Sequence, residues 1–73
     1  MTAEFKNAER LESIAKAEAK KLRYCGFDAK GHYNWSDNVF AVKIKNISDA
    51  DFNGMIEYQK TGVLSDEIQI IRI

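Results

Sequence analysis

The sequence has no proline, and it contains only one cysteine (Cys25) and one histidine (His32). A single cysteine excludes a disulfide within the chain, and one cysteine with one histidine gives too few soft ligands for a structural zinc site. Because no proline-rich or low-complexity stretch marks a linker, we expect residues 1–73 to form a single domain. A domain of this length buries roughly 60% of the surface that its unfolded chain exposes. Lacking disulfides and metal, it gains from self-association, so we expect a homodimer.

Long apolar runs are also absent, and the longest unbroken one covers residues 39–42. A membrane-spanning helix needs about 20 apolar residues, so the sequence predicts no contact with membranes. The first residues lack the basic and apolar regions of a secretory signal. Together with the unpaired thiol, these absences predict a cytoplasmic protein.

The chain carries no net charge, because eleven basic residues balance eleven acidic ones. The two signs are unevenly distributed: residues 1–45 have a balance of +3 and residues 46–73 a balance of −3. Such a separation can steer a partner or favour association of unlike ends, but +3 is low for a dedicated nucleic-acid binder.

Residues 2–24 have helical periodicity, with lysines and glutamates opposite an apolar side made of Leu11, Ala15, Ala19 and Leu22. Gly26 supplies the left-handed residue that commonly ends a helix. At about 1.5 Å per residue this helix is long for so small a domain, and alanines allow another backbone to approach it closely. We therefore expect it to pack on a sheet and, in the expected homodimer, to be a candidate for contact with a second copy of itself.

The middle of the chain has the short β-branched and aromatic runs of a β-meander. We expect turns at residues 30–31 and 36–38, a short strand over 32–35 and a clear strand over 39–45. In the clear strand, Phe40, Val42 and Ile44 alternate with polar residues and form the expected core face.

Ser48 begins a second helical pattern that ends at Gly62, and residues 67–73 form an apolar final strand. The predicted fold class is α+β, in the order α–β–β–β–α–β. A long N-terminal helix packs on a three- to four-stranded, mainly antiparallel sheet. The residues expected to be mostly buried are Leu11, Ala15, Leu22, Phe40, Val42, Ile44, Phe52, Ile56, Ile68 and Ile70.

No catalytic pattern stands out, so we expect a non-enzyme without a cofactor. His32 has no acid or nucleophile at a spacing that implies a relay. The helix dipole opposes a thiolate at Cys25 while Lys21 and Arg23 favour one, and we expect Cys25 to be a buried or half-buried structural cysteine. The acids near residue 50 lack the spacing of a calcium loop, and the four glycines form no phosphate-binding motif.

Two kinds of partner fit the sequence. Aromatic and basic residues interleave between residues 27 and 45, which is typical of a sheet that binds RNA or single-stranded DNA. This alternative function uses Lys30, Tyr33, Trp35, Lys43 and Lys45. The preferred interpretation is a small regulator or inhibitor that binds another protein. Its expected contact residues are Tyr33, Trp35, Tyr58, Asp49, Asp51 and Glu57.

The last third of the chain resembles the C-terminal part of the small phage-encoded inhibitors of uracil-DNA glycosylase. The resemblance covers residues 48–73 and consists of a Ser48-Asp49 helix start with Phe52, followed by Glu67-Ile68 in a final strand. It implies a phage or mobile-element protein that docks on a larger protein. The long N-terminal helix has no counterpart in that family, so the resemblance assigns no residue roles.

Overall fold

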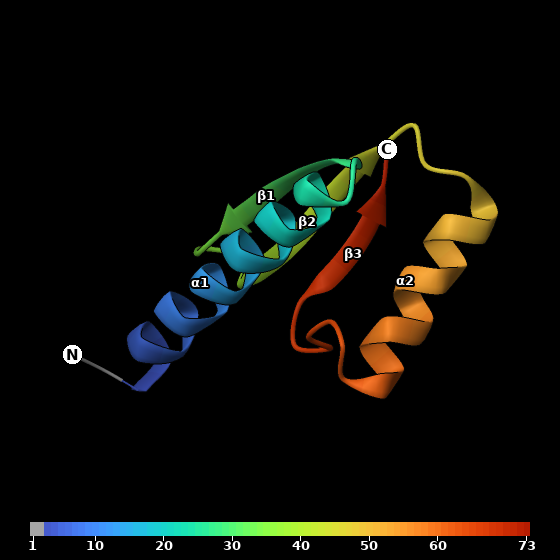
Figure 1. The fold of residues 1–73 in the computed structure, drawn as a ribbon. Coiled ribbons are helices and arrows are strands. Elements are labelled where there is room, and N and C mark those ends of the chain that lie inside the picture. Colours follow the sequence, from blue (N-terminus) through green and yellow to red (C-terminus); the bar gives the residue numbers. More distant parts are fainter. Residues whose placement is uncertain (1–2) are drawn as a thin grey trace.

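The computed structural model describes residues 3–73 and contains two helices and three strands in those residues (Figure 1). The position of residue 2, the expected start of the first helix, lies outside this range. The elements are α1 (Ala3–Tyr24), β1 (Asp28–Asn34), β2 (Val39–Lys45), α2 (Asp49–Thr61) and β3 (Gln69–Arg72).

The predicted α+β class is confirmed, with three strands in the order β1-β2-β3. The sheet is mixed, because β1 pairs antiparallel with β2 whereas β3 pairs parallel with β2. The element order is α–β–β–α–β, so the prediction contained one strand too many. The expected turn at residues 30–31 is wrong, since β1 passes through both residues without a break.

A short turn joins β1 to β2 as expected. The side chain of Asn34 accepts from the backbone amide of Asp37 at 3.2 Å and donates to the Asp37 carboxylate at 2.8 Å. Asn38 takes the left-handed conformation, with φ of 56°, which asparagine tolerates better than most residues. The predicted turn over residues 36–38 is therefore confirmed, and asparagine and aspartate side chains stabilise it.

One hydrophobic core lies between the sheet and the two helices. The strands contribute alternate residues to it, and the register places Ala29 opposite Ile44 and Val42 opposite Ile70. Because every strand residue in this core lies on the same side of the sheet, α1 and α2 both cover that side. We call the other side, which neither helix covers, the open face.

The predicted core is largely confirmed. Ala15, Leu22, Phe40, Val42, Ile44 and Ile68 are buried, while Leu11, Phe52, Ile56 and Ile70 are half-buried. The prediction missed Met55 and Leu64, which are 2% and 3% exposed and connect α2 to the end of α1. Ala15 and Ala19 are almost fully buried, so the small residues of α1 do bring its backbone close to the sheet.

The second helix begins and ends as its sequence predicts. The Ser48 hydroxyl accepts from the Asp51 amide at 3.1 Å, and Gly62 follows the last turn with φ of 86°. At the start of α2, Asp49 pairs with Arg72 of β3, whose guanidinium lies 5.4 Å from the centre of the Phe52 ring. These contacts attach α2 to the edge of the sheet.

Candidate functional site

The open face carries most of the polar side chains of the sheet. Residues alternate between the two sides of a strand, so every second residue of β1, β2 and β3 points away from the helices. These residues are Asp28, Lys30, His32, Asn34, Val39, Ala41, Lys43, Lys45, Gln69 and Ile71, and Ile73 follows them at the chain end.

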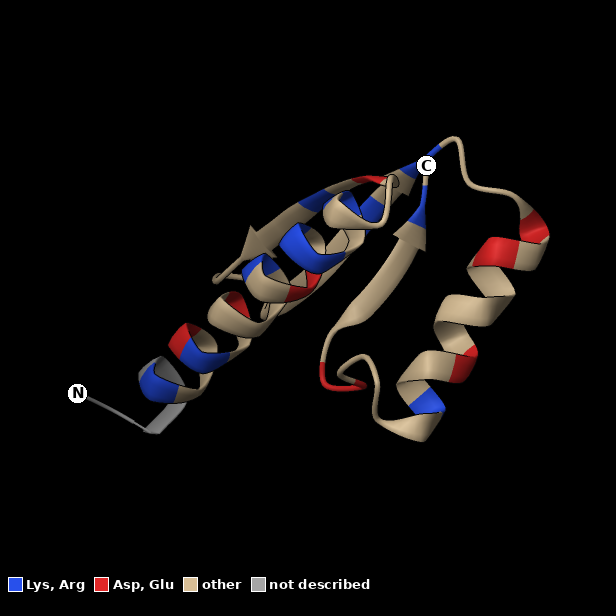
Figure 2. Ribbon diagram, viewed as in Figure 1, with Lys and Arg blue, Asp and Glu red and all other residues tan. Residues whose placement is uncertain are grey.

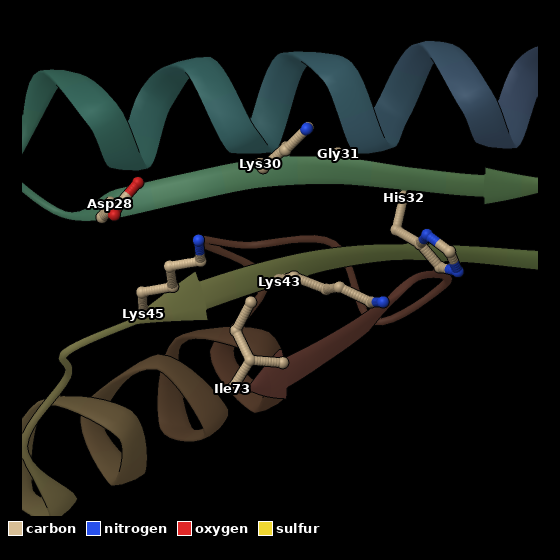
Figure 3. Close-up of a pocket in the computed structure, with 7 residues that line it drawn as sticks. All are labelled: Asp28, Lys30, Gly31, His32, Lys43, Lys45 and Ile73. Carbon is tan, nitrogen blue, oxygen red and sulfur yellow. The ribbon is translucent and has the colours of Figure 1, made fainter.

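A hollow of about 290 Å³ lies on the open face. It is lined by the side chains of Lys30 and His32 from β1, Lys43 and Lys45 from β2, and by Asp28, Gly31 and Ile73 (Figure 3). The strand register places these lysines on the same face, because Lys30 lies directly opposite Lys43 and Asp28 lies opposite Lys45. We call Lys30, His32, Lys43 and Lys45 the basic cluster.

The basic cluster concentrates positive charge on a molecule without net charge. Five ion pairs join side chains that the structure describes, and none of them involves Lys30, Lys43 or Lys45. Like charges placed directly opposite in a sheet repel, so Lys30 and Lys43 cost stability unless an anion lies between them. Figure 2 shows these basic segments on β1 and β2, and acidic segments at the start of α2.

The aromatic residues expected beside these lysines lie elsewhere. Tyr33 is half-buried and points to the helix side, where the Lys16 ammonium lies 5.7 Å from the centre of its ring. Phe40 is buried opposite Tyr33, and Phe27 packs against the same core. Trp35 follows β1 in the turn and is 41% exposed. The structure thus brings the lysines together without a stacking surface beside them.

The position of Tyr33 changes its acidity. Burial raises the pKa of Tyr33 above its ordinary value of 10.0, the negative charge of Glu12 raises it further, and Arg23 opposes both effects. Folding therefore stabilises the neutral phenol. That contribution to stability is complete below about pH 10 and is lost as the pH rises through the higher pKa of the folded protein.

We expect alkaline absorbance titrations to show this shift. The difference between the native protein and Tyr33→Phe isolates the Tyr33 phenol, and its midpoint should lie above pH 10. Glu12→Gln should lower that midpoint, because it removes one of the two causes. A midpoint of the Tyr33 titration at or below pH 10.0 would show that the Tyr33 side chain does not lie on the helix side of the sheet beside Glu12.

The residues expected to contact a protein partner do not form one surface. Tyr58, Asp49, Asp51 and Glu57 belong to α2, whereas Tyr33 and Trp35 lie at the opposite end of the molecule, near the β1–β2 turn (Figure 1). Two of the acids are engaged locally, since Asp49 pairs with Arg72 and Glu57 with Lys60.

A second hollow, of about 350 Å³, lies between the C-terminal end of α1 and one side of α2 with the segment that follows it. We call it the helix groove. Its lining includes the core residues Leu22, Met55 and Leu64, the half-buried Phe27, and the exposed Cys25, Tyr58 and Val63. The expectation that Cys25 is a buried or half-buried structural cysteine is therefore wrong. Sequence analysis missed this groove because its walls come from segments about 30 residues apart.

No group of three or more His, Cys, Asp or Glu side chains within residues 3–73 is arranged to hold a metal ion. In the same part of the chain, neither helix combines the length and apolar character that a bilayer span requires. Comparisons of the chain with protein-family models, with curated proteins and with solved structures found no match.

Proposed function

We propose that this protein is a small nucleic-acid-binding module that holds the phosphate backbone on its open face. One observation carries the proposal: Lys30, Lys43 and Lys45 line a single hollow with only one acid, Asp28, and none of the ion pairs between described side chains involves these lysines. An anion bound there replaces the repulsion between the opposed Lys30 and Lys43 by attraction to both.

The spacing of the basic cluster suits a chain of phosphates better than a single small anion. Lys43 and Lys45 lie on one strand, so their backbone positions are separated by roughly 7 Å. Lys30 extends the cluster onto β1, and His32 adds a ring nitrogen beside Lys43 (Figure 3). Lysines on flexible stems can follow successive phosphates without requiring one fixed geometry.

The position of the aromatic residues determines whether such a module can distinguish one base sequence from another. Tyr33 and Phe40 face the helices, so no ring from these positions is available to stack on bases at the basic cluster. Contacts to phosphate position a nucleic acid but carry no sequence information. We therefore expect binding with little preference for base sequence.

Fluorescence anisotropy with labelled oligonucleotides tests the proposal through its salt dependence. Three neutralised phosphates correspond to a slope of about −2 for single strands and about −3 for duplexes in log affinity against log salt. Between 50 and 200 mM salt, the affinity should fall by roughly 20- to 40-fold. A glutamate-rich peptide of equal charge serves as the control. Absence of binding at the lower salt, or affinity that salt leaves unchanged, would exclude this function.

Binding to another protein is retained as a second candidate function, because the helix groove exposes apolar side chains. Tyr58 and Val63 at its edge are 53% and 56% exposed. Of the residues predicted to contact a protein, Tyr58 and Asp51 line this groove. Both functions are non-enzymatic and need no cofactor.

A further inference from the structure

The helix groove is open because the α2 residues that line it include two with little or no side chain. Ala50 and Gly54 lie one helical turn apart on the side of α2 that lines the groove. A Cβ atom built at Gly54 would meet nothing within 4 Å, so the space beside this glycine is empty. The floor is apolar and closed, since Leu22, Met55 and Leu64 are each at most 5% exposed.

Charge of opposite sign flanks the two walls. At the end of α1, the exposed Lys21 lies at the groove and donates to the Val63 carbonyl oxygen at 3.4 Å. Lys20 lies outside the groove lining, and Arg23 donates to the Ala29 carbonyl oxygen of β1. In the first turn of α2, Asp51 is exposed and has no ion pair among the described side chains, whereas Asp49 pairs with Arg72 and Glu57 with Lys60. Lys21 and Asp51 themselves line the groove. A partner that fits must therefore be apolar at its centre, acidic opposite α1 and basic opposite α2.

We propose that the occupant is a second copy of this chain, docked groove to groove about a two-fold axis that runs along the groove. This axis places Lys21 of each copy against Asp51 of the other, so the favourable contact occurs twice. A two-fold axis across the groove would instead face like charges. Tyr58 and Val63 of each copy then cover the apolar floor of its partner.

The size of the molecule is compatible with such an interface. The chain measures 41 × 23 × 19 Å, and a stable dimer needs about 1,000 Å² of buried surface in total, or roughly 500 Å² from each copy. The groove with its exposed edges lies on the helix side of the sheet. The open face therefore stays accessible in the dimer, and this inference does not depend on the proposed function.

Sedimentation equilibrium of the full chain tests the dimer. The native protein should have twice the monomer mass of 8.3 kDa at micromolar concentration. Val63→Glu and Tyr58→Glu place a charge in the apolar centre and should weaken association at least tenfold. Ile73→Glu is the matched control, because Ile73 is an equally exposed apolar residue outside the groove. Its dimer should match that of the native protein.

Two further sets of variants test separately how charge and how the shape of the groove contribute to dimer formation. Lys21→Glu and Asp51→Lys should each weaken the dimer, and their combination should recover much of the loss, because the opposite signs are restored. Gly54→Leu should fill the groove and release monomers, whereas Gly54→Ala adds one methyl group and should leave the dimer intact. Circular dichroism confirms that each variant is folded.

Several results would overturn the inference. A native mass of 8.3 kDa at every concentration up to about 1 mM would show that the copies do not associate. A dimer that persists unchanged in Val63→Glu, or that responds equally to Ile73→Glu, would place the interface outside the helix groove.

Discussion

Replacing Lys30, Lys43 and Lys45 together by glutamine is expected to lower the affinity for oligonucleotides by roughly a hundredfold at low salt. Each exposed cation near a polyanion contributes on the order of 1 kcal/mol, so three of them correspond to about 3 kcal/mol. The slope of log affinity against log salt should also approach zero, because no phosphate on the open face is then neutralised. Anisotropy titrations at two salt concentrations measure both quantities.

A matched variant distinguishes the open face from overall charge. Lys6, Lys20 and Lys60 are exposed lysines of the two helices, and replacing them by glutamine removes the same net charge. This control should keep most of the affinity and most of the salt slope. Equal losses in both triple variants would mean that the nucleic acid is attracted by net charge alone and that the basic cluster is not its binding site.

The stability of the two variants gives an independent check on the cluster. Removing the charges of Lys30 and Lys43 relieves a repulsion between directly opposed residues, so the open-face variant should unfold at an equal or higher urea concentration. A protein that loses binding but keeps or gains stability has lost a functional surface. Loss of both together would indicate damage to the sheet instead.

The position of the basic cluster on one face of the sheet could have been predicted from the sequence. Between residues 28 and 34, polar side chains occur at every second position, as Asp28, Lys30, His32 and Asn34, which is the period of a half-exposed strand. A turn at Lys30-Gly31, which the sequence analysis predicts, interrupts this pattern. Correct alternation would have placed Lys30 and His32 on one face and Tyr33 on the other.

Other features depend on contacts that local pattern does not contain. The alternation of β2 identified Phe40, Val42 and Ile44 as core residues, and the structure confirms them. The parallel pairing of β3 with β2, however, follows from the path of α2 across the sheet. The helix groove likewise requires the end of α1 to lie beside α2, which no spacing within either helix reveals.

Gly31 lies within β1, and its lack of a side chain makes room for the Tyr33 ring. A Cβ atom at this position would lie 2.0 Å from the Tyr33 hydroxyl oxygen and 2.6 Å from the ring carbon that carries it. Both residues point to the helix side, so the tyrosine ring folds back over the glycine. Here the glycine makes space for a neighbouring ring within a regular strand.

Gly31→Ala is therefore expected to destabilise the protein by about 1–3 kcal/mol, because the methyl group forces the Tyr33 ring out of its place. In a domain of this size such a loss lowers the melting temperature by roughly 4–8 °C for each kcal/mol. Urea denaturation of the native protein and the variant measures the change in the free energy of unfolding.

The same substitution should behave differently once the ring is removed. In a Tyr33→Leu background the methyl group has room, and replacing a strand glycine by alanine lowers the entropy of the unfolded chain. Gly31→Ala should then be neutral or stabilising, which gives a coupling of at least about 1 kcal/mol between the two positions. If Gly31→Ala costs as much with leucine as with tyrosine at position 33, the ring does not occupy the space above Gly31. The side of the sheet on which Tyr33 lies, and with it the separation of aromatic and basic faces, would then have to be revised.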